Sequence, residues 1–194
     1  LSAMRKEAAS ELEMAIKEGL LDLNFLDVQF VIAFTALDEY SSIGKDEVEF
    51  KISMNPGEPV RALSDVASGG ELSRIMLAIK TVMAEKDQIE TLIFDEIDVG
   101  ISGRTAQKVS EKMAVIGRNH QVICITHLAQ IAAMADAHYA IEKKVINGKT
   151  KTMITLLDGE QEIAELARIL GGAEITETVL QSAAEMKELA KGAK

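Results

Sequence analysis

A short apolar run that ends in two adjacent acids constrains the fold of this chain more than any other stretch. Residues 91–94 are Thr-Leu-Ile-Phe, and Asp95 and Glu96 follow directly. An apolar run of this length between polar neighbours is typical of a buried strand, most often in a parallel sheet. Ligands of open α/β sheets bind just beyond the carboxyl ends of such strands. The stretch therefore predicts an α/β fold with a candidate site at Asp95 and Glu96, the alternative being two solvated acids in a loop.

A second buried strand is predicted over residues 121–126 (QVICIT), and His127 follows it. The stretch between the two strands predicts a helix over residues 103–117, with apolar side chains on one face. In a β-α-β unit the two parallel strands end at the same edge of the sheet. A lone histidine is more often structural, but this position favours a place for His127 beside Asp95.

Two consecutive glycines, Gly69 and Gly70, begin another predicted helix. Ser68 and Glu71 have the spacing of a capping box, in which both side chains bond to backbone N–H groups at the helix start. A cap does not need two glycines, which cost helix stability. Residues without a side chain let the N–H groups of a helix start approach an anion closely, and the helix dipole adds attraction. The pattern favours an anion site, with which a capping box is compatible.

The rest of the chain alternates between predicted helices and strands. Residues 1–20 carry an apolar stripe, which is typical either of the last turns of a coiled coil or of an amphipathic surface helix. Strands are predicted over residues 25–37, 48–54, 137–146 and 150–157, a loop over 38–47, and helices over 128–135, 160–170 and 174–191. Asn147 and Gly148 predict a tight hairpin turn.

The composition excludes several classes of protein. With 31 acidic and 21 basic residues the formal charge is −10, so the chain as a whole is a poor non-specific nucleic-acid binder. Cys124 is the single cysteine, which excludes an internal disulfide framework and fits a reducing cytoplasm. No apolar run approaches the ~20 residues of a transmembrane helix, and the first residues do not have the pattern of a signal peptide.

Lysines cluster around the predicted hairpin, at positions 143, 144, 149 and 151. They could form a nucleic-acid patch, but lysines also protect edge strands from unwanted pairing, and we favour that interpretation. The run Gly-Lys-Thr at 148–150 resembles the end of a P-loop, G-x-x-x-x-G-K-[ST]. Position 143 holds lysine where that motif needs glycine, and a tight hairpin is the wrong context, so the sequence contains no P-loop.

Three motifs occur in a fixed order and together resemble the C-terminal half of an ABC-type ATPase head. Residues 68–71 (SGGE) resemble the signature motif, residues 92–96 (LIFDE) resemble Walker B, and His127 falls at the switch histidine. Residues 99–102 fall where the D-loop lies. The sequence around these motifs is most similar to bacterial DNA repair relatives of the SMC proteins, and the similarity covers nearly the whole chain. It includes the runs NPGEP (55–59), FDEIDVGISG (94–103), THLAQIA (126–132), LDGE (157–160) and AELARILGG (164–172).

The resemblance implies a role for each residue on the Walker B side of the site. Asp95 would hold Mg²⁺, through water, and Glu96 would be the general base that orients the attacking water. His127 would contact the γ-phosphate of ATP. Positioning and charge stabilisation do most of the work in phosphoryl transfer, so these residue types suit it.

The resemblance also implies that Ser68, Gly69 and Gly70, with Glu71, bind the γ-phosphate held by the opposite head of a dimer. Ser102 stands where the D-loop usually has an acidic residue. This departure puts signalling across the dimer through that position in doubt.

The implied fold is the C-terminal lobe of such a head, mainly a parallel sheet with flanking helices plus an antiparallel strand pair. Residues 1–22 would be the end of a coiled coil, and residues 23–194 the lobe. Walker A and the Q-loop belong to the N-terminal half of the head, which this sequence does not contain. We therefore expect the chain alone neither to bind ATP well nor to hydrolyse it.

The implied function is ATP hydrolysis in recombinational repair of DNA double-strand breaks, in which ATP joins two heads and hydrolysis separates them. The expected partners are the N-terminal half of the head, a second head, and DNA through the full-length protein, in the cytoplasm at the nucleoid and without a membrane. One alternative is the nucleotide-binding subunit of a membrane transporter, but the Gly-Ile-Ser-Gly run at 100–103 is unlike transporter D-loops. Another is a non-catalytic dimerisation scaffold, against which the intact acids and histidine argue.

Overall fold

The computed structural model describes residues 1–66, 69–84, 86, 88–172 and 174–193. Two compact units divide the chain. The first holds Leu1–Gly100 and Val115–Ile125, and the second holds Ile101–Ala114 and Thr126–Lys194. None of the helices among the described residues is both long and apolar enough to cross a lipid bilayer.

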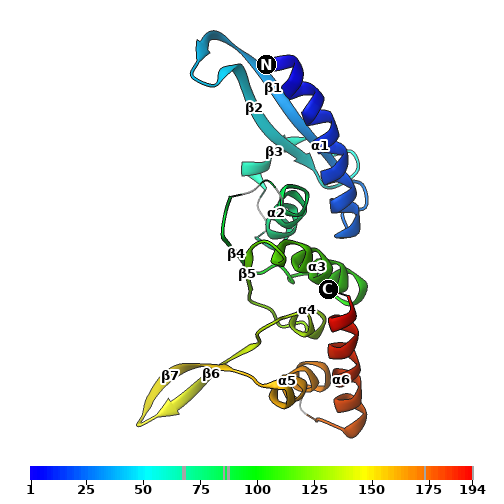
Figure 1. Cartoon of the computed structure of the whole chain (residues 1–194), viewed down its shortest axis with the longest axis vertical. Coiled ribbons are helices and arrows are strands. Elements are labelled where there is room, and N and C mark those ends of the chain that lie inside the picture. Colours follow the sequence, from blue (N-terminus) through cyan, green and yellow to red (C-terminus); the bar gives the residue numbers. More distant parts are fainter. Residues whose placement is uncertain (67–68, 85, 87, 173, 194) are drawn as a thin grey trace. The chain divides into compact units, whose positions relative to one another are not determined.

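A long helix and a β-hairpin form the beginning of the first unit. Helix α1 (Ser2–Asp22) lies along strands β1 (Gln29–Ser41) and β2 (Gly44–Ser53), as Figure 1 shows. The two strands pair antiparallel, and the Phe30 and Phe50 rings meet edge to face at 5.5 Å between centroids. Strand β3 (Arg61–Ala62) pairs with β2 and leads into a short 3₁₀ turn, η1 (Leu63–Asp65). The helix predicted over residues 1–20 is confirmed, whereas its place in a coiled coil stays a prediction.

The loop predicted over residues 38–47 is wrong, because both strands continue through it to a turn at positions 42 and 43. The polar composition of this stretch suggested a loop, but a two-stranded ribbon pairs through backbone groups and leaves its polar side chains in solvent. Asp46 is anchored to α1, since it accepts hydrogen bonds from Ser2 Oγ at 2.7 Å and Arg5 Nη1 at 3.1 Å. The Ser2 hydroxyl is the main cause of a lowered pKa of the Asp46 carboxyl.

Helix α2 (Gly69–Met83) packs against α1 in the core of the first unit. Hydrophobic burial drives this contact, since apolar side chains from both helices are fully removed from water. The fully buried side chains of this unit include Ile16, Leu20, Leu23, Val28, Ile75 and Leu77.

Strands β4 (Thr91–Phe94) and β5 (Gln121–Cys124) form the parallel sheet, and the other two sheets among the described residues are antiparallel. Helix α3 (Gly103–Gly117) connects β4 to β5, with the bounds expected from the sequence. Its predicted buried face is confirmed at Ala106, Val109, Met113 and Ile116. The α/β fold class is therefore confirmed.

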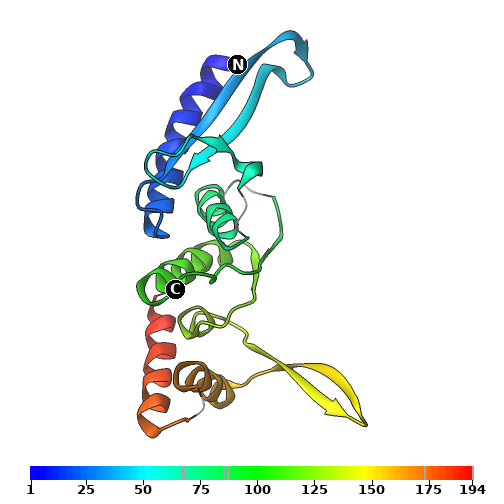
Figure 2. The same cartoon turned by 180° about the vertical axis from the view of Figure 1, so that it is seen from behind.

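The second unit contains a small helical core and a hairpin. Helices α4 (Ala129–Ala133), α5 (Gly159–Gly171) and α6 (Glu177–Gly192) bury a cluster of mainly alanine side chains around Leu166. Strands β6 (Tyr139–Ile146) and β7 (Lys149–Leu156) extend away from these helices (Figure 2). Asn147 and Gly148 have φ angles of 52° and 73°, as the predicted tight turn requires.

Candidate functional site

The two acids predicted from the sequence lie at the carboxyl end of β4. Phe94 pairs with Cys124 at the end of the parallel ladder, and the Ile125 N–H donates to the Phe94 carbonyl at 3.0 Å. Asp95 and Glu96 come next and are both exposed. One carboxylate oxygen of Asp95, Oδ1, accepts a hydrogen bond from the Glu96 N–H at 2.9 Å. The acids thus follow a parallel strand, as expected, but the prediction that this strand is fully buried is wrong, because Thr91 and Ile93 are exposed and Phe94 is the buried residue of β4.

Glu96 adopts a backbone conformation that is rare for a residue with a side chain. Its φ angle is 57°, in the left-handed region, which costs on the order of 1 kcal/mol or more for a non-glycine residue. Its carbonyl accepts from the Val99 N–H at 3.1 Å, which closes a turn over Ile97 and Asp98. Both of these residues are buried. The chain therefore turns sharply back into the protein directly after the two acids.

The glycine pair at the start of α2 packs against this turn. A Cβ added to Gly70 would lie 2.9 Å from the Glu96 carbonyl oxygen and 3.1 Å from Val99 Cβ. One added to Gly69 would lie 2.5 Å from the carboxylate oxygen Oε2 of Glu96. Close packing against this turn is thus one reason for glycine at these two positions, in addition to the anion site that the sequence predicts. Ser68, the other residue of that predicted site, lies outside the described residues.

Two consecutive residues of α2 donate hydrogen bonds to the backbone around the turn. Ser73 Oγ donates to the Asp95 carbonyl at 2.9 Å, and Arg74 Nη1 donates to the Val99 carbonyl at 2.8 Å. Glu71, also predicted for the site, is half-buried and lines a small pocket of about 200 Å³ with Arg61 and Asp65. All of the predicted site residues at positions 69–71, 95 and 96 belong to the first unit.

Ser102 and His127 belong to the second unit. Ser102 is exposed just before α3, and its carbonyl accepts from the Thr105 N–H at 3.2 Å. His127 is exposed in the segment between β5 and α4. Their roles beside the acids stay predictions.

Three residues at the site were missed by sequence reasoning. Arg74 and Asp98 are buried charged side chains, and Cys124 ends β5 beside the acids. Burial, with the negative charges of Asp98 and Asp95, raises the pKa of the Cys124 thiol to about 12, so this thiol stays protonated.

The sequence did contain a signal that Arg74 is buried. It lies four residues from Gly70 and from Ala78 and so shares a helix face with them. Asp98 stands between two apolar residues, which was a weaker signal.

The described residues contain no group of three or more His, Cys, Asp or Glu side chains placed to hold a metal ion. Mg²⁺ needs fewer protein ligands than such a group provides, because it is usually held by one or two carboxylates with water and substrate phosphates. An exposed carboxylate at a strand end, as at Asp95, fits this kind of binding.

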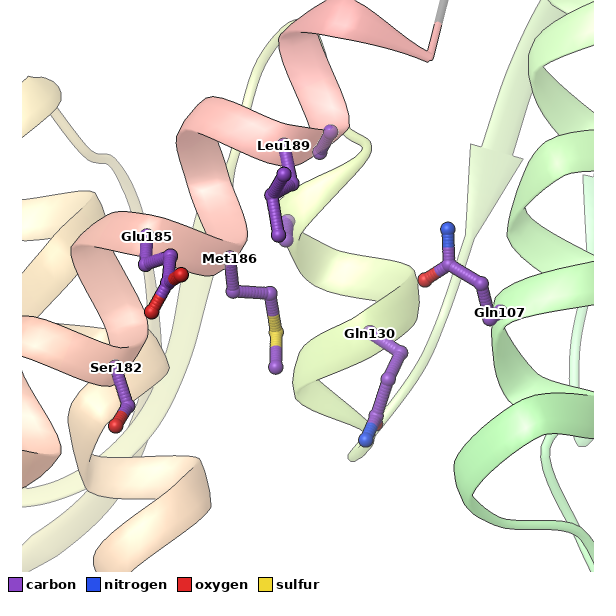
Figure 3. Close-up of a pocket in the computed structure, with 8 residues that line it drawn as sticks. Gln107, Gln130, Ser182, Glu185, Met186 and Leu189 are labelled. Carbon is purple, nitrogen blue, oxygen red and sulfur yellow. The ribbon is translucent and has the colours of Figure 1, made fainter.

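A pocket in the second unit is lined by residues of α3, α4 and α6. It has a volume of about 340 Å³. Gln107 and Gln130 come from α3 and α4, and α6 contributes the side chains labelled in Figure 3 as Ser182, Glu185, Met186 and Leu189. None of the residues predicted for the site lines it.

Comparison with solved structures defines the class of fold. No protein-family model matches the chain. The Smc head domain with a coiled coil and joint from Pyrococcus yayanosii superposes with a TM-score of 0.59 over 84% of this chain and 29% of that one, at 20% identity. The chain therefore has the fold of part of an Smc head.

Comparison with curated protein sequences then identifies the proteins to which the chain is related. The chain is 43% identical over its whole length to the DNA repair protein RecN of Halalkalibacterium halodurans, and 44% identical over 96% of its length to RecN of Vibrio cholerae. It spans 35% and 34% of these two proteins. The chain is thus a homologue of about a third of a RecN protein, which agrees with the family that its motifs resemble.

Proposed function

We propose that the chain forms the C-terminal lobe of an SMC-like ATPase head that acts in recombinational repair of DNA double-strand breaks. The observation that carries this proposal is the exposed Asp95–Glu96 pair at the end of β4, packed against the glycine start of α2. The likeness to proteins named for DNA repair supports the biological role. Residues 1–22 would end a coiled coil, and residues 23–194 would form the lobe.

Asp95 would hold Mg²⁺ through water at the edge of the parallel sheet. Its exposed carboxylate suits a cation that keeps most of its water and also binds phosphate oxygens. When bound, Mg²⁺ neutralises the charge that develops on the phosphates of ATP.

Glu96 would act as the general base by accepting a hydrogen bond from the attacking water and orienting it. Its carboxylate is exposed, while its backbone is held in a fixed left-handed turn. A base that is fixed in this way loses little freedom when the substrate binds. His127 would contact the γ-phosphate of the same nucleotide.

The start of α2 would bind the γ-phosphate that a second head holds. Gly69 and Gly70, which have no side chains, would let the backbone N–H groups of a helix start approach an anion, and Ser68 and Glu71 flank them in the motif. Ser102 would occupy the D-loop between the two heads. The partners are then the N-terminal half of the head, a second copy of the protein, and DNA, with the protein at the nucleoid.

The test is ATP hydrolysis by the full-length protein, with and without linear duplex DNA. Glu96→Gln is expected to lower kcat by at least about 100-fold, the usual contribution of a general base, while ATP still binds. The matched control is Glu90→Gln, the same change at an exposed position just before β4, with kcat expected to stay at the wild-type value. If Glu96→Gln and Glu90→Gln hydrolyse ATP equally fast, the catalytic proposal fails and a dimerisation scaffold is favoured.

A further inference from the structure

Arg74 is a buried cation in a helix whose other buried residues are apolar or glycine. Only 7% of its surface is exposed, on the face of α2 that is turned into the first unit. Removing a charge from water is costly unless polar partners replace the water. Burial lowers the pKa of the Arg74 guanidinium, and the negative charge of Glu71 opposes that shift. The role of this buried guanidinium must therefore be sought in the groups that contact it.

Those partners connect two separate parts of the first unit. On one side, Nη1 of Arg74 donates to the Val99 carbonyl at 2.8 Å and, more weakly, to the Ile97 carbonyl at 3.5 Å. On the other side, the guanidinium carbon lies 5.6 Å from the centroid of the Phe25 ring, within the range of a cation–π contact. Phe25 follows α1, and its N–H donates to the Leu20 carbonyl at 3.2 Å.

The guanidinium is not fully satisfied by these contacts. Among the described residues, Nε of Arg74 is buried and has no hydrogen-bond partner. Most buried polar atoms in proteins are hydrogen-bonded, and an orphaned donor costs about 1–3 kcal/mol. An apolar side chain of similar length would avoid that cost, so stability alone is a poor reason for an arginine here.

The hydrogen bonds from α2 flank one particular residue. Ser73 donates to the Asp95 carbonyl and Arg74 donates to the Val99 carbonyl. Glu96 lies between these two carbonyls, in its left-handed conformation. Two neighbouring residues of one helix thus fix the backbone before and after the proposed general base. We call this pair the Ser73–Arg74 clamp.

We propose that Arg74 is a positioning residue for ATP hydrolysis, which holds residues 97–99 against α2 and so fixes Glu96. This inference rests on the function proposed above for Glu96. The energetic reason is that a conformation costing on the order of 1 kcal/mol persists only where its surroundings impose it. Without the guanidinium, the turn after Glu96 relaxes, and the carboxylate spends less time in the geometry that orients water.

Steady-state ATP hydrolysis by the full-length protein tests the clamp. Arg74→Met retains an unbranched apolar side chain but cannot donate, and we expect kcat to fall about tenfold, which corresponds to 1.36 kcal/mol. We expect KM for ATP to change by less than about twofold, since Arg74 does not touch the nucleotide in this proposal. Arg74→Lys retains a cationic donor group, without the planar fork of the guanidinium, and is expected to recover part of the loss. Lys80→Met removes a cation from the same helix and is the control, with wild-type kcat.

A second measurement does not depend on ATP. The Val99 amide, which closes the turn on Glu96, should exchange its hydrogen about tenfold faster in Arg74→Met than in Lys80→Met. If Arg74→Met does not fold, Arg74→Lys and Ser73→Ala serve instead, and both are expected to lower kcat about threefold. Wild-type kcat in the folded variants overturns the proposal, whether or not exchange changes. If the wild type itself hydrolyses no ATP, the proposed function has failed, and unchanged Val99 exchange then shows that the clamp has failed as well.

Discussion

Helices α5 and α2 both begin with a glycine, but different parts of the chain determine where each helix starts. At α5, Asp158 Oδ1 accepts from the Gln161 N–H at 3.0 Å, and the Gln161 side chain accepts from the Asp158 N–H at 3.1 Å. This is a complete capping box made by residues of the helix start itself. A Cβ added to Gly159 would meet nothing within 4 Å.

At α2 the partner of the helix start is the turn after Glu96, more than 20 residues further along the chain. Gly70 is needed there because the backbone of that turn occupies the space of a Cβ. The start of α5 is therefore specified locally, whereas the start of α2 is specified by tertiary packing at the candidate site. Substitutions at the two helix starts should separate these cases.

The largest effect is expected at Gly70. Helix propensity alone would make Gly70→Ala stabilising by up to about 1 kcal/mol. The added Cβ would instead lie 2.9 Å from the Glu96 carbonyl oxygen, and backbone cannot move aside as a side chain can. We expect this overpacking to lower the free energy of unfolding by about 2 kcal/mol, measured by urea unfolding of the chain.

Gly69→Ala is the matched control for that experiment. Its Cβ meets the end of the Glu96 side chain, which can rotate away, so the loss of stability should be clearly smaller than for Gly70→Ala. Equal losses for the two variants, or a gain for Gly70→Ala, would show that the turn does not determine the start of α2.

A smaller effect is expected from the capping box of α5. Asp158→Ala removes the acceptor for the Gln161 N–H and should cost about 1 kcal/mol in the free energy of unfolding. Asp158→Asn keeps an acceptor oxygen and should recover most of that loss. Urea unfolding reports both values, and an unchanged midpoint for Asp158→Ala would mean that the box does not stabilise the helix.

The sequence predicts well those features that neighbouring residues determine. The bounds of α3, its buried face and the placement of Asp95 beyond β4 follow from local periodicity and from a short apolar run. The capping box of α5 was equally readable, since Asp158 precedes Gln161 by three residues, but the helix was predicted to begin at position 160. That error came from an overlooked local signal rather than from a missing one.

The features that sequence reasoning missed depend on distant partners. The spacing of Arg74 from Gly70 and Ala78 places it on their helix face, but its partners, the carbonyls of residues 97 and 99 and the ring of Phe25, are distant in sequence. The packing reason for Gly70 likewise appears only when the turn after Glu96 is in place. The nucleotide-binding roles of the site residues stay predictions, which the hydrolysis experiments test.

The smallest expected effect has the opposite sign and completes the comparison. Gly159→Ala places a Cβ in open space at the first position of α5, where the native φ is one that alanine can adopt. The substitution restricts the unfolded chain and should raise the free energy of unfolding by about 0.4 kcal/mol, again by urea unfolding. The same chemical change would thus stabilise one helix start and destabilise the other. A loss of stability at Gly159 as large as that at Gly70 would mean that both glycines are kept for backbone reasons, and the contrast between local capping and tertiary packing would not hold.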